Sequence, residues 1–356
     1  MGETAVSRSA LNLATVDPTP IFEHYRGAFG TELLTAAVAH LRVFETLAER
    51  ALSFDELAGA LSLAARPLVV LTTALRAMGL LEVDRAGRFV LTALAREHLL
   101  PGGEFFVGDY VGLAAESPGV LGMVERLRTN RPWGANDKSE EGAAFIYREG
   151  TPSAMEQEAK ARHLTLALAG RAKNVAPALA ANLSTSGART LLDLGGGTGI
   201  YSIALVQRNP ELRAVVFDRP EVLKVAAEMT AEYGVADRVQ LQPGDMFVDA
   251  LPTGCDLVLL SNILHDWDVP ECRTLVGRAA EALAPGGRLW IHDVFLNDAH
   301  DGPLPIALYS AALFTLTEGR AYSAAEYRAM LTAAGLRPGS LTPTAIHCGV
   351  LEGIKQ

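Results

Sequence analysis

The chain of 356 residues has few cysteines, no long apolar run and no excess of positive charge. Its three cysteines, Cys255, Cys272 and Cys348, lie far apart without paired spacing, which argues against a disulfide framework or a zinc site and fits a reducing cytosol. Because no run of roughly eighteen apolar residues occurs, no membrane-spanning helix is expected. The formal net charge of −10 disfavours nucleic acid or an anionic membrane as a partner. The sequence therefore predicts a cytoplasmic protein without a metal site.

The composition that remains favours a folded protein of more than one domain. Hydrophobic residues make up 49% of the chain and charged residues 20%, which is enough apolar surface for large cores. The length of the chain exceeds what a single core commonly organises. Residues 1–20 lack the basic start and apolar stretch of a signal peptide, and we expect them to form a loose leader.

Residues 21–105 are predicted to form a mostly helical unit with a winged-helix pattern. Apolar residues recur at helical spacing over 32–47, and Ser53 with Glu56 three positions later is typical of a capping box. A second helix is expected over 64–78 with Gly79 as its stop, and a short hairpin over 80–91. The apolar surface of these helices predicts a homodimer interface.

A winged helix can also bind DNA, so a DNA-binding regulator is the rival interpretation of this unit. Residues 1–100 contain nine Arg and no Lys against eleven Asp and Glu. The helix that would read the bases consists mostly of Leu, Val, Ala and Thr. Both features favour a dimerisation or lid role, with no nucleic acid as partner.

Residues 106–185 are expected to be a helical linker that lines a substrate pocket, interrupted by loops near 132–134 and 150–152. A second part of the pocket lining is expected over 305–320. The candidate pocket residues are Trp133, Phe145, Tyr147, Met155, His163, Tyr309 and Phe314.

From 186 to 356 the pattern changes to short apolar runs separated by helical segments. Runs that are apolar throughout are typical of strands buried on both faces of a parallel sheet, so we predict an α/β domain with a doubly wound, Rossmann-like sheet. Two weaker late runs, 339–342 and 348–354, can add an antiparallel hairpin at one edge. The main predicted strands are 190–194, 214–218, 239–242, 257–261 and 288–293.

The strongest motif is LLDLGGGTG at 191–199, where a buried strand ends in a glycine-rich turn that should open a helix near Tyr201. Glycine permits a tight turn and the close approach of a ligand. A dinucleotide fingerprint needs glycine at its sixth position, where Ile200 stands, and Asp193 would repel phosphates. The same carboxylate can accept from an ammonium or a hydroxyl group. A nucleoside without a pyrophosphate is therefore favoured over a dinucleotide or an ordinary strand-to-helix turn.

Acidic residues also end the next two strands. Asp218 can accept from both ribose hydroxyls of a nucleoside, and it can equally cap the helix that begins at Pro220. Asp245 can accept from an adenine amino group while Met246 and Phe247 cover the faces of the ring.

His265 follows the fourth strand, where sheets of this class hold their ligands. A neutral imidazole, with an ordinary pKa of about 6.5, takes a proton from a hydroxyl near neutral pH. Asp293, at the end of the fifth strand, can orient the ring of a general base. From these residues alone, a structural histidine that caps the next helix is an equal alternative.

Nearly the whole chain resembles the small-molecule O-methyltransferases of plants and bacteria, which include caffeate, acetylserotonin and polyketide-tailoring enzymes. The resemblance is carried by LDLGGGTG (192–199), FDRP (217–220), GDMF (244–247), LHDWD (264–268) and LAPGG (283–287). It implies a class I methyltransferase domain, a homodimer, S-adenosyl-L-methionine as cofactor and His265 as general base. The expected cofactor contacts are Asp193, Gly195, Gly197, Asp218, Arg219, Asp245, Met246, Phe247, Ser261 and Trp267.

Three positions depart from the pattern of that family. Ser261 stands where many relatives keep a lysine, and Asp293 stands where plant members carry a longer glutamate. The run Ala321-Tyr322-Ser323 replaces Glu-Arg-Thr, so the second carboxylate beside the histidine is absent at position 321. We therefore expect the cofactor site to be retained, with His265 held by Asp293 alone.

The function expected from the sequence is transfer of a methyl group from a sulfonium to a hydroxyl of a small aromatic or polyketide-like molecule. The leaving thioether is neutral, so the reaction requires no metal ion to stabilise it. The alternatives that stay open are methylation at nitrogen or carbon, and a cofactor-binding relative with diverged chemistry.

Overall fold

The computed structural model describes residues 8–131, 155 and 157–356. The chain divides into two compact units: an α/β unit of residues 1–20, 147–295 and 324–356, and a helical unit of 21–146 and 296–323. The sequence predicts instead that each domain is one continuous range of residues. The difference arises because local periodicity reports which element forms, and not which hydrophobic core that element joins.

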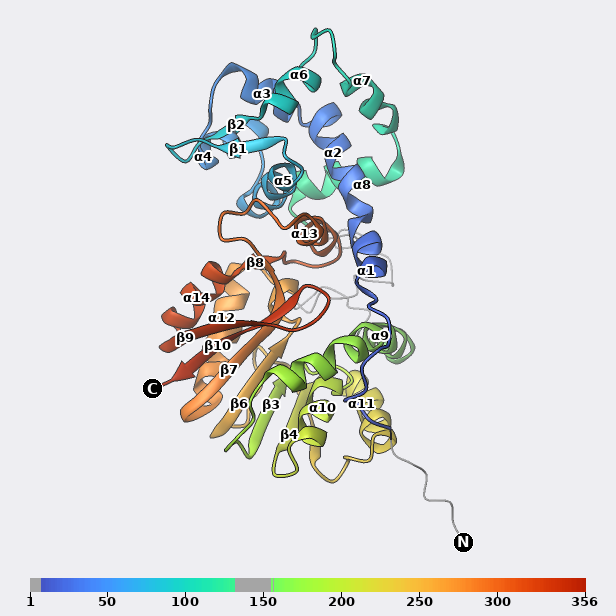
Figure 1. Cartoon of the computed structure of the whole chain (residues 1–356), viewed down its shortest axis with the longest axis vertical. Helices are drawn as coiled ribbons and strands as arrows, with labels where there is room; N and C mark the ends of the chain where they lie inside the picture. The colour runs from blue at the N-terminus through green and yellow to red at the C-terminus, as the bar shows by residue number, and fades with distance from the viewer. Residues whose placement is uncertain (1–7, 132–154, 156) are drawn as a thin grey trace. The chain divides into compact units, whose positions relative to one another are not determined.

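The sheet of the α/β unit has the strand order β5-β4-β3-β6-β7-β10-β9 (Figure 1). The strands from β5 to β7 are parallel, and β10 and β9 add an antiparallel edge. This order confirms the predicted doubly wound sheet and its edge hairpin. The strands are β3 Thr190–Leu194, β4 Arg213–Asp218, β5 Val239–Pro243, β6 Cys255–Ser261, β7 Leu283–Leu296, β9 Leu336–Pro343 and β10 Cys348–Lys355.

Helices cover both faces of this sheet. α9, α10 and α11 lie on one face, and α12 and α14 lie on the other (Figure 1). Right-handed crossovers explain the division, because the chain moves outward in opposite directions from the neighbouring strands β3 and β6. The helices are α9 Glu158–Asn182, α10 Ile200–Arg208, α11 Pro220–Glu232, α12 Val269–Ala282 and α14 Ala324–Ala333.

Part of the expected loose leader is held on the α/β unit. The backbone N–H of Ala10 donates to Gln207 Oε1 at 2.8 Å, and Gln207 Nε2 donates to the carbonyl of Arg8 at 3.0 Å. The guanidinium of Arg8 lies 2.5 Å from the carboxylate of Glu232. Residues 8–10 therefore differ from the loose segment that composition indicates.

The helical unit contains the expected winged-helix elements, with one difference. Ser53 and Glu56 form a capping box at the start of α4, and β1 pairs antiparallel with β2. The helix expected over 32–47 is broken, because a π-helical turn covers 36–40 and Arg42 adopts a φ of +52° that redirects the chain. The elements are α1 Thr19–Arg26, α2 Gly30–Thr35, α3 Val43–Glu49, α4 Phe54–Leu61, α5 Ala65–Ala77, β1 Leu81–Val83, β2 Phe89–Leu91, α6 Ala93–His98, α7 Gly108–Val111, α8 Pro118–Thr129, α13 Leu304–Leu316 and β8 Tyr322–Ser323.

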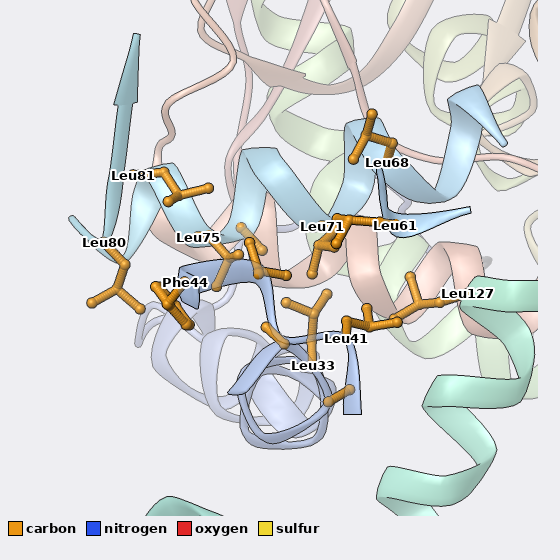
Figure 2. Packing of buried hydrophobic residues seen from close by; sticks show 14 of the residues in the cluster. Leu33, Leu41, Phe44, Leu61, Leu68, Leu71, Leu75, Leu80, Leu81 and Leu127 are labelled. Atoms are coloured by element: carbon orange, nitrogen blue, oxygen red, sulfur yellow. The ribbon is translucent and has the colours of Figure 1, made fainter. Parts of the chain in front are cut away.

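The helix that would read DNA, α5, lies inside the core of the helical unit. Figure 2 shows Leu68, Leu71 and Leu75 of this helix among Phe44 and the buried leucines of the neighbouring segments. Nine of the thirteen residues of α5 are buried. Since a recognition helix must offer polar side chains to base edges, this burial argues against DNA reading. Among the described helices, none alone is long and apolar enough to span a membrane. The bent pair α4 and α5 together has the length and composition of a span.

Candidate active site

The predicted site residues lie on or just after five parallel strands, β3, β4, β5, β6 and β7, toward their carboxyl ends. The backbone N–H of Gly197, after β3, donates to Asp218 Oδ2 at the end of β4 at 2.8 Å. Arg219 Nη1 in turn donates to Asp245 Oδ2, after β5, at 3.1 Å. β3 and β6 are neighbours although they are not consecutive, so the strand order reverses between them. Open α/β sheets hold their ligands outside such a reversal, which makes this edge the candidate site.

The glycine-rich turn after β3 brings three strand ends close together. Gly195 has a φ of +71°, and a Cβ added there would lie 2.5 Å from Ile263 Cδ1 and 3.8 Å from Met246 Sδ. Only glycine allows this approach without displacing Ile263. Gly197 has a φ of +58° and open space where its Cβ would stand. The turn thus offers bare backbone toward a ligand.

Asp193 is a buried carboxylate with an unmatched oxygen. Its side chain is fully enclosed, and Oδ2 accepts from the hydroxyl of Ser202 at 2.7 Å. Among the described residues Oδ1 has no hydrogen-bond partner. Burial raises the pKa of Asp193 to about 7, and the nearby negative charge of Asp218 adds to the rise. A buried acceptor of this kind is costly unless a donor is supplied from elsewhere.

Asp218 is half-buried and stabilises the glycine-rich turn. Its Oδ2 accepts from the N–H of Gly197 and its Oδ1 from the N–H of Arg219 at 2.7 Å. Burial raises the pKa of Asp218 to about 6, although both backbone bonds act in the opposite direction. A carboxylate has about four acceptor sites, so each oxygen can take one further donor.

The segment after β5 combines a polar group with apolar rings. Asp245 Oδ1 accepts from the backbone N–H of Phe247 at 2.8 Å. The ring of Phe247 lies edge-on to the buried ring of Trp267, with centroids 4.7 Å apart. Arg219 forms an ion pair with Asp245. The arrangement provides an acceptor beside an apolar surface, while the direct cofactor contact expected of Arg219 stays a prediction.

His265 lies in a 3₁₀ turn after β6 and is almost fully buried. Its Nδ1 is 2.6 Å from Asp293 Oδ1. Burial raises the pKa of the Asp293 carboxyl, but the charge and hydrogen bond of His265 outweigh burial and lower it. The ionised carboxylate only accepts, so Nδ1 carries the proton of the neutral ring and Nε2 is left as the acceptor.

A second carboxylate faces the same imidazole, which differs from the expectation that Asp293 alone holds it. Asp266 Oδ1 lies 3.6 Å from His265 Nε2. Burial lowers the pKa of His265, yet the charges of Asp293 and Asp266 outweigh it and the pKa is raised. The pKa of Asp266 is itself raised to about 6 by burial. Although the three side chains lie together, the described residues contain no group placed to hold a metal ion.

Ser261 belongs to a buried polar network beneath the turn that carries His265. Its Oγ lies 2.7 Å from His292 Nδ1 and accepts from Asn262 Nδ2 at 3.0 Å. Burial and the charge of Arg171 lower the pKa of His292 to about 3, so that ring is neutral. Arg171 Nη1 donates to Asn262 Oδ1 at 2.7 Å. The Ser261 hydroxyl is thus engaged with polar side chains of the protein, and its expected cofactor contact stays a prediction.

Several candidate pocket residues have a clear place in one unit. Phe314 lies in the core of the helical unit, and the ring of Tyr309 lies 4.1 Å below the guanidinium of Arg26. Met155 is buried in the α/β unit, whereas His163 is exposed. The other three candidates lie outside the described residues: Trp133, Phe145 and Tyr147.

Four residues of the site were not assigned a role from the sequence. The glycine at 195 indicates that another side chain packs closely against the turn, and that side chain is Ile263. Asp266 adjoins His265 in the LHDWD motif. Ser202 and Tyr327 carry no local signal, because their contacts with Asp193 and Asp293 depend on how the chain folds. Tyr327 donates from its hydroxyl to Asp293 Oδ2 at 3.2 Å.

Two family models match most of the chain. An O-methyltransferase domain matches residues 142–337, and an O-methyltransferase dimerisation domain matches 22–100. The chain is 47% identical to the O-methyltransferase family 2 protein from Planctomyces limnophilus DSM 3776, whose structure contains apigenin. That likeness covers 98% of this chain and 99% of the other, with a TM-score of 0.87.

Curated relatives carry related activities. A 3-hydroxy-5-methyl-1-naphthoate 3-O-methyltransferase from Streptomyces sahachiroi is 36% identical over 89% of each chain. An L-tyrosine C(3)-methyltransferase from Streptomyces lavendulae is 33% identical over 88% of this chain and 85% of its own. The similarity therefore spans both units and includes relatives that differ in the atom they methylate.

Proposed function

The chain belongs to the O-methyltransferase family, and we propose that it transfers a methyl group from S-adenosyl-L-methionine to a hydroxyl of a small aromatic or polyketide-like molecule, with His265 as the general base. The observation that carries the proposal is the pairing of His265 with the ionised Asp293 beside a glycine-rich turn and an unmatched buried carboxylate.

The residues after β3, β4 and β5 fit the chemistry of this cofactor. Asp193 Oδ1 is a buried acceptor with no donor in the part of the chain that the structure describes, which suits the ammonium group of an amino acid. Asp218 has acceptor sites left for ribose hydroxyls, and Asp245 has them for an adenine amino group. Met246 and Phe247 are half-buried and offer apolar surface to the ring. Asp193, Gly195, Gly197, Asp218, Asp245, Met246, Phe247 and Trp267 would hold the cofactor.

When bound, S-adenosylmethionine would supply a methyl group on a positively charged sulfur, and that sulfur would leave as a neutral thioether. This chain orients the acceptor and removes its proton. Nδ1 of His265 is committed to Asp293, so Nε2 takes the proton of the acceptor hydroxyl as the oxygen attacks. Positioning contributes roughly 7–11 kcal/mol in reactions of this kind. A general base contributes roughly 10²–10⁴-fold.

The acceptor class is inferred from relatives. The naphthoate enzyme acts on an aromatic hydroxyl, and the Planctomyces protein holds apigenin, an aromatic molecule with several hydroxyl groups. The tyrosine C(3)-methyltransferase makes transfer to an aromatic carbon the second candidate. Both reactions need a base near an aromatic ring, so His265 does not distinguish them.

We also propose that the protein is a homodimer built mainly by the helical unit. The match to a dimerisation domain over 22–100 supports this assembly. Large apolar side chains are exposed on the same unit, and exposed apolar surface favours an interface where it is contiguous. They include Leu94, Phe105, Tyr110 and Leu113.

Methyl transfer from S-adenosylmethionine with a ¹³C-labelled methyl group tests the function. Apigenin and a 3-hydroxy-1-naphthoate are the acceptors, and a carbon–proton correlation spectrum identifies the atom that receives the label. We expect an aryl methoxy signal. A label on an aromatic carbon would favour the second candidate. Cofactor binding without transfer to either acceptor would contradict the proposed acceptor class.

A further inference from the structure

We propose that Tyr327 is a positioning residue for methyl transfer: its buried hydroxyl holds Asp293 in the orientation from which that carboxylate directs His265. The inference rests on the proposed role of His265 as the base. It assigns a role in the reaction to α14, a helix that carries none of the motifs by which the site was recognised.

Tyr327 is brought to the site by the buried face of α14. Ala324, Tyr327, Met330 and Leu331 are the buried residues of this helix, at the spacing of a single helical face. The Tyr327 ring is fully enclosed and lies edge-on to Phe295, with centroids 5.7 Å apart. The packing fixes the ring, so the hydroxyl is held 3.2 Å from Asp293 Oδ2.

The donors to Asp293 divide between its two oxygens. His265 Nδ1 and the backbone N–H of Val294 both reach Oδ1, at 2.6 and 2.8 Å. The described donor to Oδ2 is the hydroxyl of Tyr327. Without it, the carboxylate is anchored through one oxygen and can twist about its Cβ–Cγ bond. Since the orientation of an imidazole follows that of its carboxylate partner, Tyr327 acts on His265 through Asp293.

The titration of His265 reports on this contact. Among the described residues, the charged groups that act on the ring are Asp293 on β7, Asp266 in its own turn and Arg171 on α9. Removing the Tyr327 hydroxyl leaves Asp266 and Arg171 in place. It also leaves more of the negative charge of Asp293 facing the imidazolium, because the phenol no longer shares that charge. The pKa of His265 should therefore rise further.

The experiment measures the pKa of His265 by NMR of ¹³C-labelled histidine, with His265→Gln to assign its signal. Tyr327→Phe removes only the hydroxyl, and Tyr233→Phe, a buried tyrosine at the end of α11, is the matched control. Both changes are repeated in the Asp293→Asn background. Rates are measured with the acceptor that is methylated in the labelling experiment.

We expect Tyr327→Phe to raise the pKa of His265 by about half a unit. It should also lower kcat by roughly three- to tenfold, with KM within about twofold. Tyr233→Phe should change neither value. In the Asp293→Asn background Tyr327→Phe should have no further effect, because a residue that acts through Asp293 has nothing left to position.

Three results would overturn the inference: wild-type values in Tyr327→Phe, equal shifts with and without Asp293, or loss of folding in Tyr327→Phe where Tyr233→Phe folds. Each would make the hydroxyl a packing feature. If Asp293→Asn alone leaves the pKa of His265 and kcat at wild-type values, the His265–Asp293 pair fails, and with it the proposed base. The single variant and the background variant therefore separate the two failures.

Discussion

Asp218→Asn should weaken the binding of S-adenosylmethionine while the protein stays folded. The carboxylate accepts hydrogen bonds from the backbone N–H groups of Gly197 and Arg219, and it is expected to accept from the ribose hydroxyls as well. An amide presents one acceptor oxygen and no charge. The variant therefore loses a charge-assisted bond to the ligand and loosens the glycine-rich turn.

The expected size follows from the value of a hydrogen bond to an ionised group. Such a bond contributes about 1.5–3 kcal/mol. One lost bond therefore raises the Kd about 10- to 150-fold. The measurement is isothermal titration calorimetry at pH 8, where a carboxyl with a pKa of about 6 is ionised.

Asp256→Asn is the matched control for this prediction. Asp256 Oδ2 accepts from the backbone N–H groups of Arg189 and Thr190, at the amino end of β3. It has the same kind of bonds as Asp218 at the opposite edge of the sheet. The Kd of Asp256→Asn for S-adenosylmethionine should stay near that of the wild type. A Kd within twofold of the wild type in Asp218→Asn, with an unchanged melting curve, would remove Asp218 from the cofactor site.

Two further predictions concern the same site and the assembly. The affinity for S-adenosylmethionine should weaken several-fold as the pH falls from 8 to 6, because protonation of Asp193, with its pKa of about 7, removes the charge that attracts the ligand ammonium. Asp193→Asn should bind weakly with a flatter pH profile in calorimetry, and a steeper or reversed profile would refute the assignment. Light scattering at micromolar concentration should give about twice the 37.8 kDa of one chain, and a monomer mass would contradict the proposed dimer.

The parallel sheet was predictable because most of its strands contain a short run of apolar residues. β3 begins and ends at the residues expected from the sequence, and the other central strands differ mainly in length. The glycine-rich turn was also predictable from the sequence, because the positive φ values at Gly195 and Gly197 favour glycine. An apolar run and a glycine at a positive φ value each involve a few neighbouring positions, so the sequence shows them directly.

Contacts between distant segments were not predictable in this way. Tyr327 meets Asp293 across 34 positions of sequence, and nothing near either residue indicates the partner. The residues 296–323 join the helical unit although they follow β7. The break at Arg42 was also missed, because the apolar spacing on either side of it continues a helical pattern. Each of these features is set by tertiary packing.

The most direct test of His265 as the base is the single-turnover rate of methyl transfer in wild type and His265→Ala as a function of pH. The wild-type rate should rise with pH through an apparent pKa above 6.5, because the folded protein raises the pKa of His265 and only the neutral ring accepts a proton. His265→Ala should lose that rise and be roughly 10²–10⁴-fold slower, with its affinity for S-adenosylmethionine within a few-fold of the wild type. A variant that keeps more than half of the wild-type rate would contradict the assignment of His265 as the base.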